Sequence, residues 1–118
     1  MAYIVRDLHA LFAVRDAVGS GECVALVQRW ANAPHGAAST WHKGVKVLGT
    51  AGIQPGTTIA TFPDGHHYEG HAAIYLGETS DGIEVFDQWQ GHKPSKRTIY
   101  SHGRHAMVDT AANYFVVD

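Results

Sequence analysis

The sequence predicts an α+β domain in which the helices come first and an antiparallel sheet follows. Helix-like apolar spacing is confined to the first third of the chain, whereas β-branched and aromatic residues gather in short runs in the second half. Glycine, proline, aspartate and serine separate those runs. Helices followed by a meander of strands are the order expected when one helix packs on an antiparallel sheet.

A short N-terminal helix is the first expected element. Leu8, Leu11, Phe12 and Val14 recur at helical spacing, so they predict one or two amphipathic turns. The stretch GSG at residues 19–21 closes this segment, because glycine disfavours a continuing helix.

A second helix is expected to begin within GSGECVALVQRW, residues 19–30. Ser20 is the predicted N-cap and residues 21–23 the first turn, because a serine side chain accepts hydrogen bonds from the free N–H groups there. Pro34 ends this helix by about Ala33. Its apolar side chains predict a mostly buried element: Val24, Leu26, Val27 and Trp30.

Residues 34–55 are expected to form an irregular connecting arm, since four glycines interrupt any longer period. A short helix around Trp41 to Val47 is predicted within it. Trp41 and Trp89 could line a groove, but both are expected to lie in the core, because tryptophan buries a large apolar area.

Five strands are predicted in the second half of the chain. They are TTIATF (57–62), HAAIYLG (71–77), GIEVFDQW (82–89), KRTIY (96–100) and NYFVVD (113–118). The stretch GETSDG between Leu76 and Ile83 has the length of a hairpin turn, so the second and third of these strands should pair antiparallel.

Size and charge limit the class of protein. A chain of 118 residues with 45% apolar composition is expected to form a single domain, residues 1–118. Nine lysines and arginines against eleven acids leave no basic stripe, which excludes nucleic acid as the expected partner. The start MAYIVRDLHALF is interrupted by charges and predicts neither a signal peptide nor a membrane span, so no membrane partner is expected.

Cys23 is the only cysteine in the chain, and its position favours a reactive thiol over an inert core residue. The free N–H groups and the dipole of a helix N-terminus stabilise an anion there, which lowers the pKa of a thiol. Gly21 permits close approach of a substrate carbonyl, so the Cys23 N–H is a candidate oxyanion donor. A lone cysteine forms no internal disulfide and leaves the redox compartment open.

His71 and Asp87 are the candidate partners of this thiol. His71 opens the most apolar strand, so it should lie at the mouth of that strand, where a base can reach the sulfur. Asp87 ends the partner strand and can accept the imidazole N–H, which leaves the other ring nitrogen facing the sulfur. The alternative interpretations are a surface histidine and a turn aspartate.

A zinc hydrolase is a competing interpretation. His66, His67 and His71 fall within six residues, and His102 and His105 are three apart. The first group lies in a glycine-containing loop, and neither HExxH nor CxxC occurs in the chain.

Three stretches carry a family resemblance: GECVALVQRW, GHAAIYLG and GIEVFDQW. Over roughly residues 19–90 the chain resembles the papain-like amidase and peptidase superfamily of bacterial cell-wall enzymes, which includes the CHAP and NlpC-type domains. Cys23, His71 and Asp87 stand where those families place the nucleophile, the histidine and the polar orienting residue. The wider pattern resembles small amidases associated with type VI secretion.

The resemblance implies a papain-like fold and cysteine-dependent hydrolysis of an amide bond in peptidoglycan, with no metal and no cofactor. A peptidoglycan peptide is then the expected substrate, and a cognate immunity protein an expected partner. It also implies export from the bacterial cytoplasm into the periplasm of a target cell. Glu22 and Tyr3 are candidate side-chain oxyanion donors. The remaining alternative is a cell-wall binding or inhibitor module that has kept the fold without the chemistry.

Overall fold

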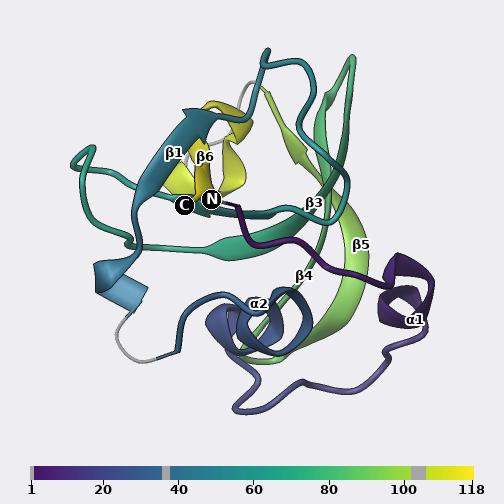
Figure 1. Ribbon diagram of the computed structural model, residues 1–118. Helices are drawn as coiled ribbons and strands as arrows, with labels where there is room; N and C mark the ends of the chain where they lie inside the picture. Colours follow the sequence, from purple (N-terminus) through teal and green to yellow (C-terminus); the bar gives the residue numbers. More distant parts are fainter. Residues whose placement is uncertain (1, 36–37, 102–105) are drawn as a thin grey trace.

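The computed structural model describes residues 2–35, 38–101 and 106–118. In these ranges an antiparallel sheet curls around one side of the longest helix (Figure 1). The elements in chain order are α1 (Leu8–Phe12), α2 (Cys23–Ala31), η1 (Ala38–Thr40), β1 (Lys43–Lys46), β2 (Thr58–Thr61), β3 (Ala72–Thr79), β4 (Gly82–Trp89), β5 (His92–Tyr100), η2 (Met107–Asp109), η3 (Ala111–Asn113) and β6 (Tyr114–Val117).

The sheet has six strands in the order β1-β6-β2-β3-β4-β5, with every neighbouring pair antiparallel. Strands β2 to β6 are the five that the sequence predicts, and β3 and β4 form the expected hairpin. The α+β prediction is therefore confirmed, with one strand more than expected.

The additional strand is β1, where a short helix around Trp41 to Val47 was expected, and that prediction is wrong. Lys43 pairs with Val117 and Lys46 with Phe115, so the segment is held as an edge strand by β6. Its sequence KGVK is mostly exposed and lacks the apolar alternation of a buried strand. Tertiary pairing thus decides its conformation.

Helix α2 begins two residues later than the sequence predicts, and Glu22 rather than Ser20 is its N-cap. The backbone turns sharply at Gly21, whose φ of 87° is a left-handed conformation that prevents a helical turn there. The Ser20 hydroxyl accepts a hydrogen bond from the Glu22 N–H at 3.3 Å instead. At the other end Asn32 adopts the left-handed conformation, so the helix stops before Pro34.

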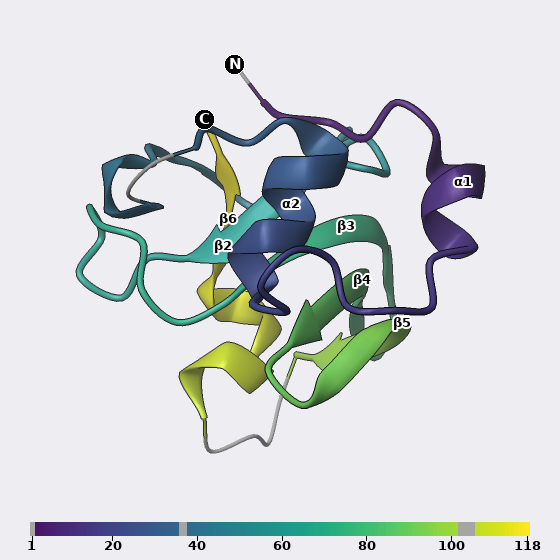
Figure 2. The same cartoon turned by 90° about the horizontal axis from the view of Figure 1, so that it is seen from below.

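Apolar side chains fill both faces of the sheet. On one face α2 packs against β3 and β4, and Figure 2 shows this helix lying across the sheet. The buried residues of that layer include Leu26, Val27, Trp41, Ile74 and Phe86. The other face holds a second cluster that includes Ile59, Tyr75, Val85, Ile99 and Tyr114. Strand β2 is buried throughout, because both layers cover it.

None of the helices within the described ranges is long and apolar enough to cross a membrane.

Candidate active site

Cys23 is the first residue of α2 and lies half-buried at the end of the sheet. The glutamate that precedes it caps the helix without a side-chain hydrogen bond. The first N–H groups of the helix therefore have no side-chain cap from that residue, and they direct their partial positive charge toward the sulfur. This is the position that the sequence predicts for a reactive thiol.

A buried threonine fixes the backbone of His71 immediately before β3. The Thr61 hydroxyl accepts a hydrogen bond from the His71 N–H at 3.1 Å and donates one to the Glu69 carbonyl. Gly70 has a φ of 110°, and a Cβ there would lie 2.6 Å from the Thr61 hydroxyl oxygen. Only glycine fits at this point, so the histidine enters the strand in one orientation.

Asp87 meets His71 through the register of the β3–β4 hairpin. Ile74 pairs with Phe86, which sets Ala73 opposite Asp87 and leaves His71 as the diagonal neighbour on the same face. His71 Nε2 lies 2.7 Å from Asp87 Oδ2, and both side chains are buried. The imidazole therefore keeps its other nitrogen, Nδ1, available for the thiol.

The Cys23 thiol is surrounded by groups that stabilise its anion. Burial by itself would raise its pKa, but hydrogen bonds from His71 and Tyr68, the charge of His71 and the Ala72 backbone N–H together lower the pKa below its ordinary value. Sulfur thus has the environment of a thiolate nucleophile.

His71 is held in its charged form. Burial would lower its pKa, whereas the hydrogen bond with Asp87, the contact with Cys23 and the negative charges of both partners raise the pKa to about 9. A lowered thiol pKa beside a raised imidazole pKa describes a thiolate–imidazolium pair.

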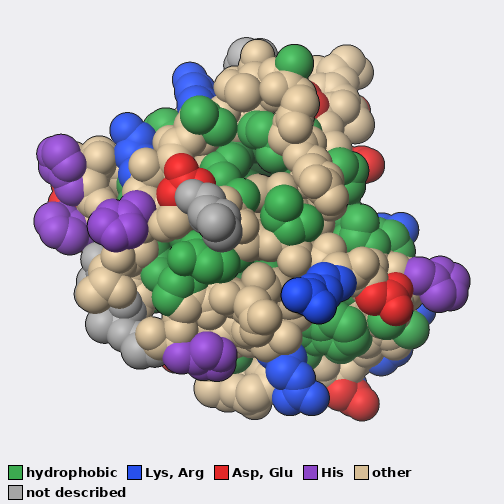
Figure 3. All heavy atoms as spheres, viewed as in Figure 1, with side chains coloured by type: hydrophobic (Ala, Val, Ile, Leu, Met, Phe, Trp, Pro, Cys, Tyr) green, Lys and Arg blue, Asp and Glu red, His purple; other side chains and the backbone are tan. Residues whose placement is uncertain are grey.

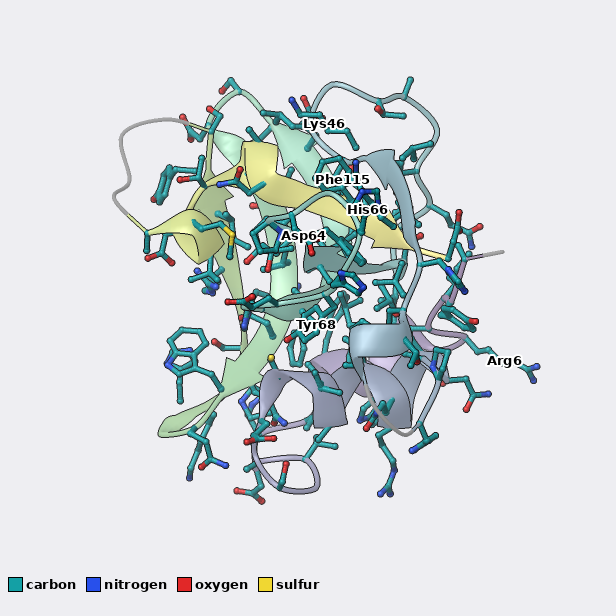
Figure 4. The ribbon with its side chains drawn as sticks, turned by 90° about the vertical axis from the view of Figure 1, so that its left-hand side faces the viewer. Arg6, Lys46, Asp64, His66, Tyr68 and Phe115 are labelled. Carbon is teal, nitrogen blue, oxygen red and sulfur yellow. The ribbon has the colours of Figure 1, made fainter. Side chains whose placement is uncertain are left out.

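Tyr68 is a site residue that sequence reasoning missed. Its hydroxyl lies 3.4 Å from the Cys23 sulfur, and its ring packs against Trp41 with centroids 5.0 Å apart. Figure 4 shows it reaching from the loop before β3 toward the start of α2. Burial and the nearby thiolate raise the pKa of Tyr68, which keeps it an O–H donor. No local sequence pattern identifies a tyrosine in a loop as a hydrogen-bond donor to a distant thiol.

Gln88 was also missed. Its buried side chain accepts a hydrogen bond from the Val18 N–H at 2.8 Å and donates to the carbonyls of Val18 and Glu22 at 2.9 and 2.8 Å. It therefore ties the loop that precedes α2 to β4. Its place beside the predicted Asp87, on the same predicted strand, was a signal that could have found it.

Cys23, Tyr68 and His71 border an open cleft of about 550 Å³. Cys23 and Glu22 lie on its α2 side, Tyr68 and His71 on the β3 side, and Trp89 at the end of β4. Trp41 is buried as expected, but Trp89 is 39% exposed, so its predicted place in the core is wrong. It pairs with His92 at the end of β4, and its ring stacks on the His92 ring with centroids 3.9 Å apart, which leaves part of the indole exposed. Tyr3 is absent from the lining, whereas Glu22 borders the cleft.

The histidines of the zinc interpretation do not converge in the described part of the chain. His66 and His67 are exposed, and His67 Nδ1 pairs with Asp64 Oδ2 at 2.8 Å, whereas His71 is buried. Figure 3 shows a group of histidine side chains standing at the margin of the molecular surface. Within the described residues no three histidine, cysteine or acidic side chains are grouped as metal ligands. His102 and His105 lie outside the described residues.

Comparison with known proteins gives a consistent set of relatives. The family described as domesticated amidase effector 2 (Dae2) matches residues 10–117. A type VI secretion amidase effector 2 protein of Salmonella typhi is 36% identical, covering 100% of both chains. Domesticated amidase effector 2 of Ixodes scapularis is 41% identical over 70% of this chain and 60% of its own length.

A solved structure of type 6 secretion amidase effector 2 (Tae2) superposes with a TM-score of 0.84. The two sequences are 34% identical, and the match covers 98% of this chain and 94% of the solved one. The likeness therefore includes the sheet and the helix that carries Cys23.

Proposed function

The chain belongs to the domesticated amidase effector 2 family, and from this premise we propose that it hydrolyses amide bonds of bacterial peptidoglycan with Cys23 as nucleophile. The family membership makes the protein an amidase. It also confirms the resemblance to papain-like cell-wall amidases and the papain-like fold that the sequence predicts. The relatives give no support to a zinc hydrolase.

One observation carries the assignment of roles: the only cysteine, at a helix N-terminus, shares a cleft with an imidazole that is hydrogen-bonded to a buried carboxylate. A nucleophile, a base and an orienting group in contact are what covalent amide hydrolysis requires. Tyr68 adds a donor on the sulfur.

In the first half of the proposed reaction, the Cys23 thiolate attacks the amide carbonyl carbon and a C–S bond forms. The oxyanion that develops is within reach of the N–H groups at the start of α2. The His71 imidazolium then gives its proton to the amide nitrogen, the C–N bond breaks, and the amine leaves. A thioester remains on Cys23.

In the second half, neutral His71 takes a proton from water while the water oxygen attacks the thioester carbon. The C–S bond breaks, the carboxylic acid product leaves, and the thiolate and the imidazolium are restored. Asp87 keeps its hydrogen bond with the ring through both halves and stabilises the imidazolium form.

Digestion of purified peptidoglycan tests the proposed function. We expect new free amino groups and peptide fragments by mass spectrometry, inhibition by iodoacetamide and no inhibition by EDTA. Inhibition by EDTA but not by iodoacetamide would favour the zinc interpretation. If the protein hydrolyses no peptidoglycan even without these two reagents, a binding module without activity would be favoured.

Replacing Tyr68 with phenylalanine should make the thiol less acidic. The substitution keeps the packing on Trp41 but removes one donor from the thiolate, so the midpoint of Cys23 alkylation should move to higher pH by about one unit. The measurement is the rate of iodoacetamide labelling between pH 4 and pH 10. Tyr100→Phe, at an exposed tyrosine on β5, is the control and should leave the midpoint unchanged.

Replacing Asp87 with asparagine should slow turnover by about 10- to 1000-fold, or about 1.4 to 4 kcal/mol of barrier. The amide keeps the size of the side chain but removes the charge that stabilises the imidazolium, and it can present an N–H to the ring. Turnover is measured beside the melting temperature as a control for folding. Unchanged turnover in a folded variant would remove Asp87 from the site.

The route of delivery and the protein partner are proposed from the relatives of this chain. The Salmonella typhi relative is a type VI secretion effector by its description. We propose that this chain likewise acts in the periplasm of a target cell, where peptidoglycan lies, and that a cognate immunity protein protects the producer.

A further inference from the structure

We propose that Arg97 is a positioning residue for the reaction, because its guanidinium holds Asp87 in the orientation that binds His71. Arg97 Nε lies 3.1 Å from Oδ1 and 2.9 Å from Oδ2 of Asp87, and Nη2 lies 2.8 Å from Oδ2. A planar guanidinium contacting both oxygens fixes the plane of a carboxylate. The inference rests on the function proposed above.

The register of the sheet brings together His71, just before β3, Asp87 on β4 and Arg97 on β5. Asp87 pairs with Ser95, so Arg97 is its diagonal neighbour on β5, as His71 is on the β3 side. Side chains alternate between faces along a strand, and these positions all fall on the same face. The row His71–Asp87–Arg97 is thus a product of strand pairing.

Because the Asp87 carboxylate is buried, it needs a cationic partner, and Arg97 supplies one. Asp87 is fully buried, and His71 contacts only its Oδ2. Among the titratable and charged groups that act on Asp87 are His71 just before β3, Arg97 from β5 and Tyr114 from β6. The Tyr114 hydroxyl donates to the Val108 carbonyl, which leaves Arg97 as the permanent cation. Without Arg97, the buried carboxylate would lose its bidentate partner and could rotate, which weakens its hold on the imidazole.

The site of Arg97 is open enough for a chemical test. Its Cζ lies 4.9 Å from the centre of the Trp89 ring, and its side chain is 24% exposed. Together with His71, Trp89 and Asp109 it lines a depression of about 390 Å³ next to the catalytic cleft. Truncation to alanine would leave a space that a free guanidinium ion can enter from solvent.

The experiment compares wild type, Arg97→Ala, Arg97→Lys and the control Arg6→Ala, with and without guanidinium chloride far below unfolding concentrations. Arg6 is exposed and extends away from the fold in Figure 4. We expect Arg97→Ala to lower kcat by about 10- to 100-fold with KM nearly unchanged, and guanidinium but not methylammonium to restore at least part of kcat. Arg97→Lys should be intermediate, since it keeps the charge without the fork.

The rate of Cys23 alkylation at fixed pH is followed in parallel because it needs no substrate. Arg97→Ala should slow labelling, and guanidinium should restore it. The proposal would be overturned if Arg97→Ala had the same kcat and labelling rate as wild type. It would also be overturned if Arg97→Ala lowered both quantities and guanidinium restored neither. If Arg97→Ala does not fold, a folded Arg97→Lys with unchanged kcat would overturn it as well. If wild type itself does not hydrolyse peptidoglycan, the proposed function fails, while labelling still decides the role of Arg97.

Discussion

Replacing Cys23 with alanine is expected to reduce peptidoglycan hydrolysis by about 10⁴-fold or more while the protein stays folded. A covalent mechanism has no substitute for its nucleophile, and no second cysteine exists in the chain. Release of amino groups from purified peptidoglycan measures the loss. Hydrolysis at the wild-type rate would rule out the thiol mechanism.

The same variant has a second expected signature at the histidine. Contact with Cys23 is one of the causes that raise the pKa of His71 to about 9, so the pKa should fall when the sulfur is removed. An NMR titration of the imidazole protons reports it without any substrate. Resonances of sheet residues that match those of wild type in the same spectra are the control for folding.

Replacing His71 with alanine is expected to lower turnover by about 10²- to 10⁴-fold, the usual contribution of a general acid and base. The variant loses both the cation that stabilises the thiolate and the acid that protonates the leaving amine. Peptidoglycan hydrolysis and iodoacetamide labelling should therefore slow together. A large loss of hydrolysis with normal labelling would mean that His71 protonates the amine but does not activate the thiol.

His66→Ala is the matched control for this substitution. His66 is an exposed histidine five residues earlier, in the loop that leads to β3. Its substitution should lower peptidoglycan hydrolysis only slightly. His67 is a poorer control, because its ring pairs with Asp64, and this pair helps to shape the loop that carries Tyr68. Strong loss in His66→Ala together with metal dependence would reopen the zinc interpretation.

The adjacency of His71 and Asp87 could be predicted because a hairpin links them. A short turn sets which residues of two strands face each other, and apolar alternation then assigns the faces. Cys23 could be placed at a helix start from local signals, although Gly21 moves that start by two residues. Both inferences depend on interactions that are close in sequence.

Tyr68 and Arg97 could not be placed in the same way. Tyr68 reaches the sulfur from a loop, across a sequence separation of 45 residues. Arg97 lies on a strand whose predicted start, at residue 96, was too late, because Pro94 interrupts the β-rich pattern while β5 begins at His92. With the true start and the pairing of Asp87 with Ser95, alternation alone would have placed Arg97 beside the carboxylate.

Asp87 and Gln88 are consecutive residues that point to opposite faces of β4. Asp87 binds the imidazole of His71, and Gln88 binds the loop that leads into α2, the helix that carries Cys23. If β4 slipped by one residue, each side chain would arrive on the wrong face, and both attachments would break in the same event. The β3–β4 pairing shifts register between Tyr75 and Gly77, on the turn side of the site, and Ile74 and Tyr75 share one register with Phe86 and Val85. Alignment of one hairpin is therefore expected to bring Asp87 to His71 and to attach the loop before α2 in the same event, and a slip of one residue would lose both contacts.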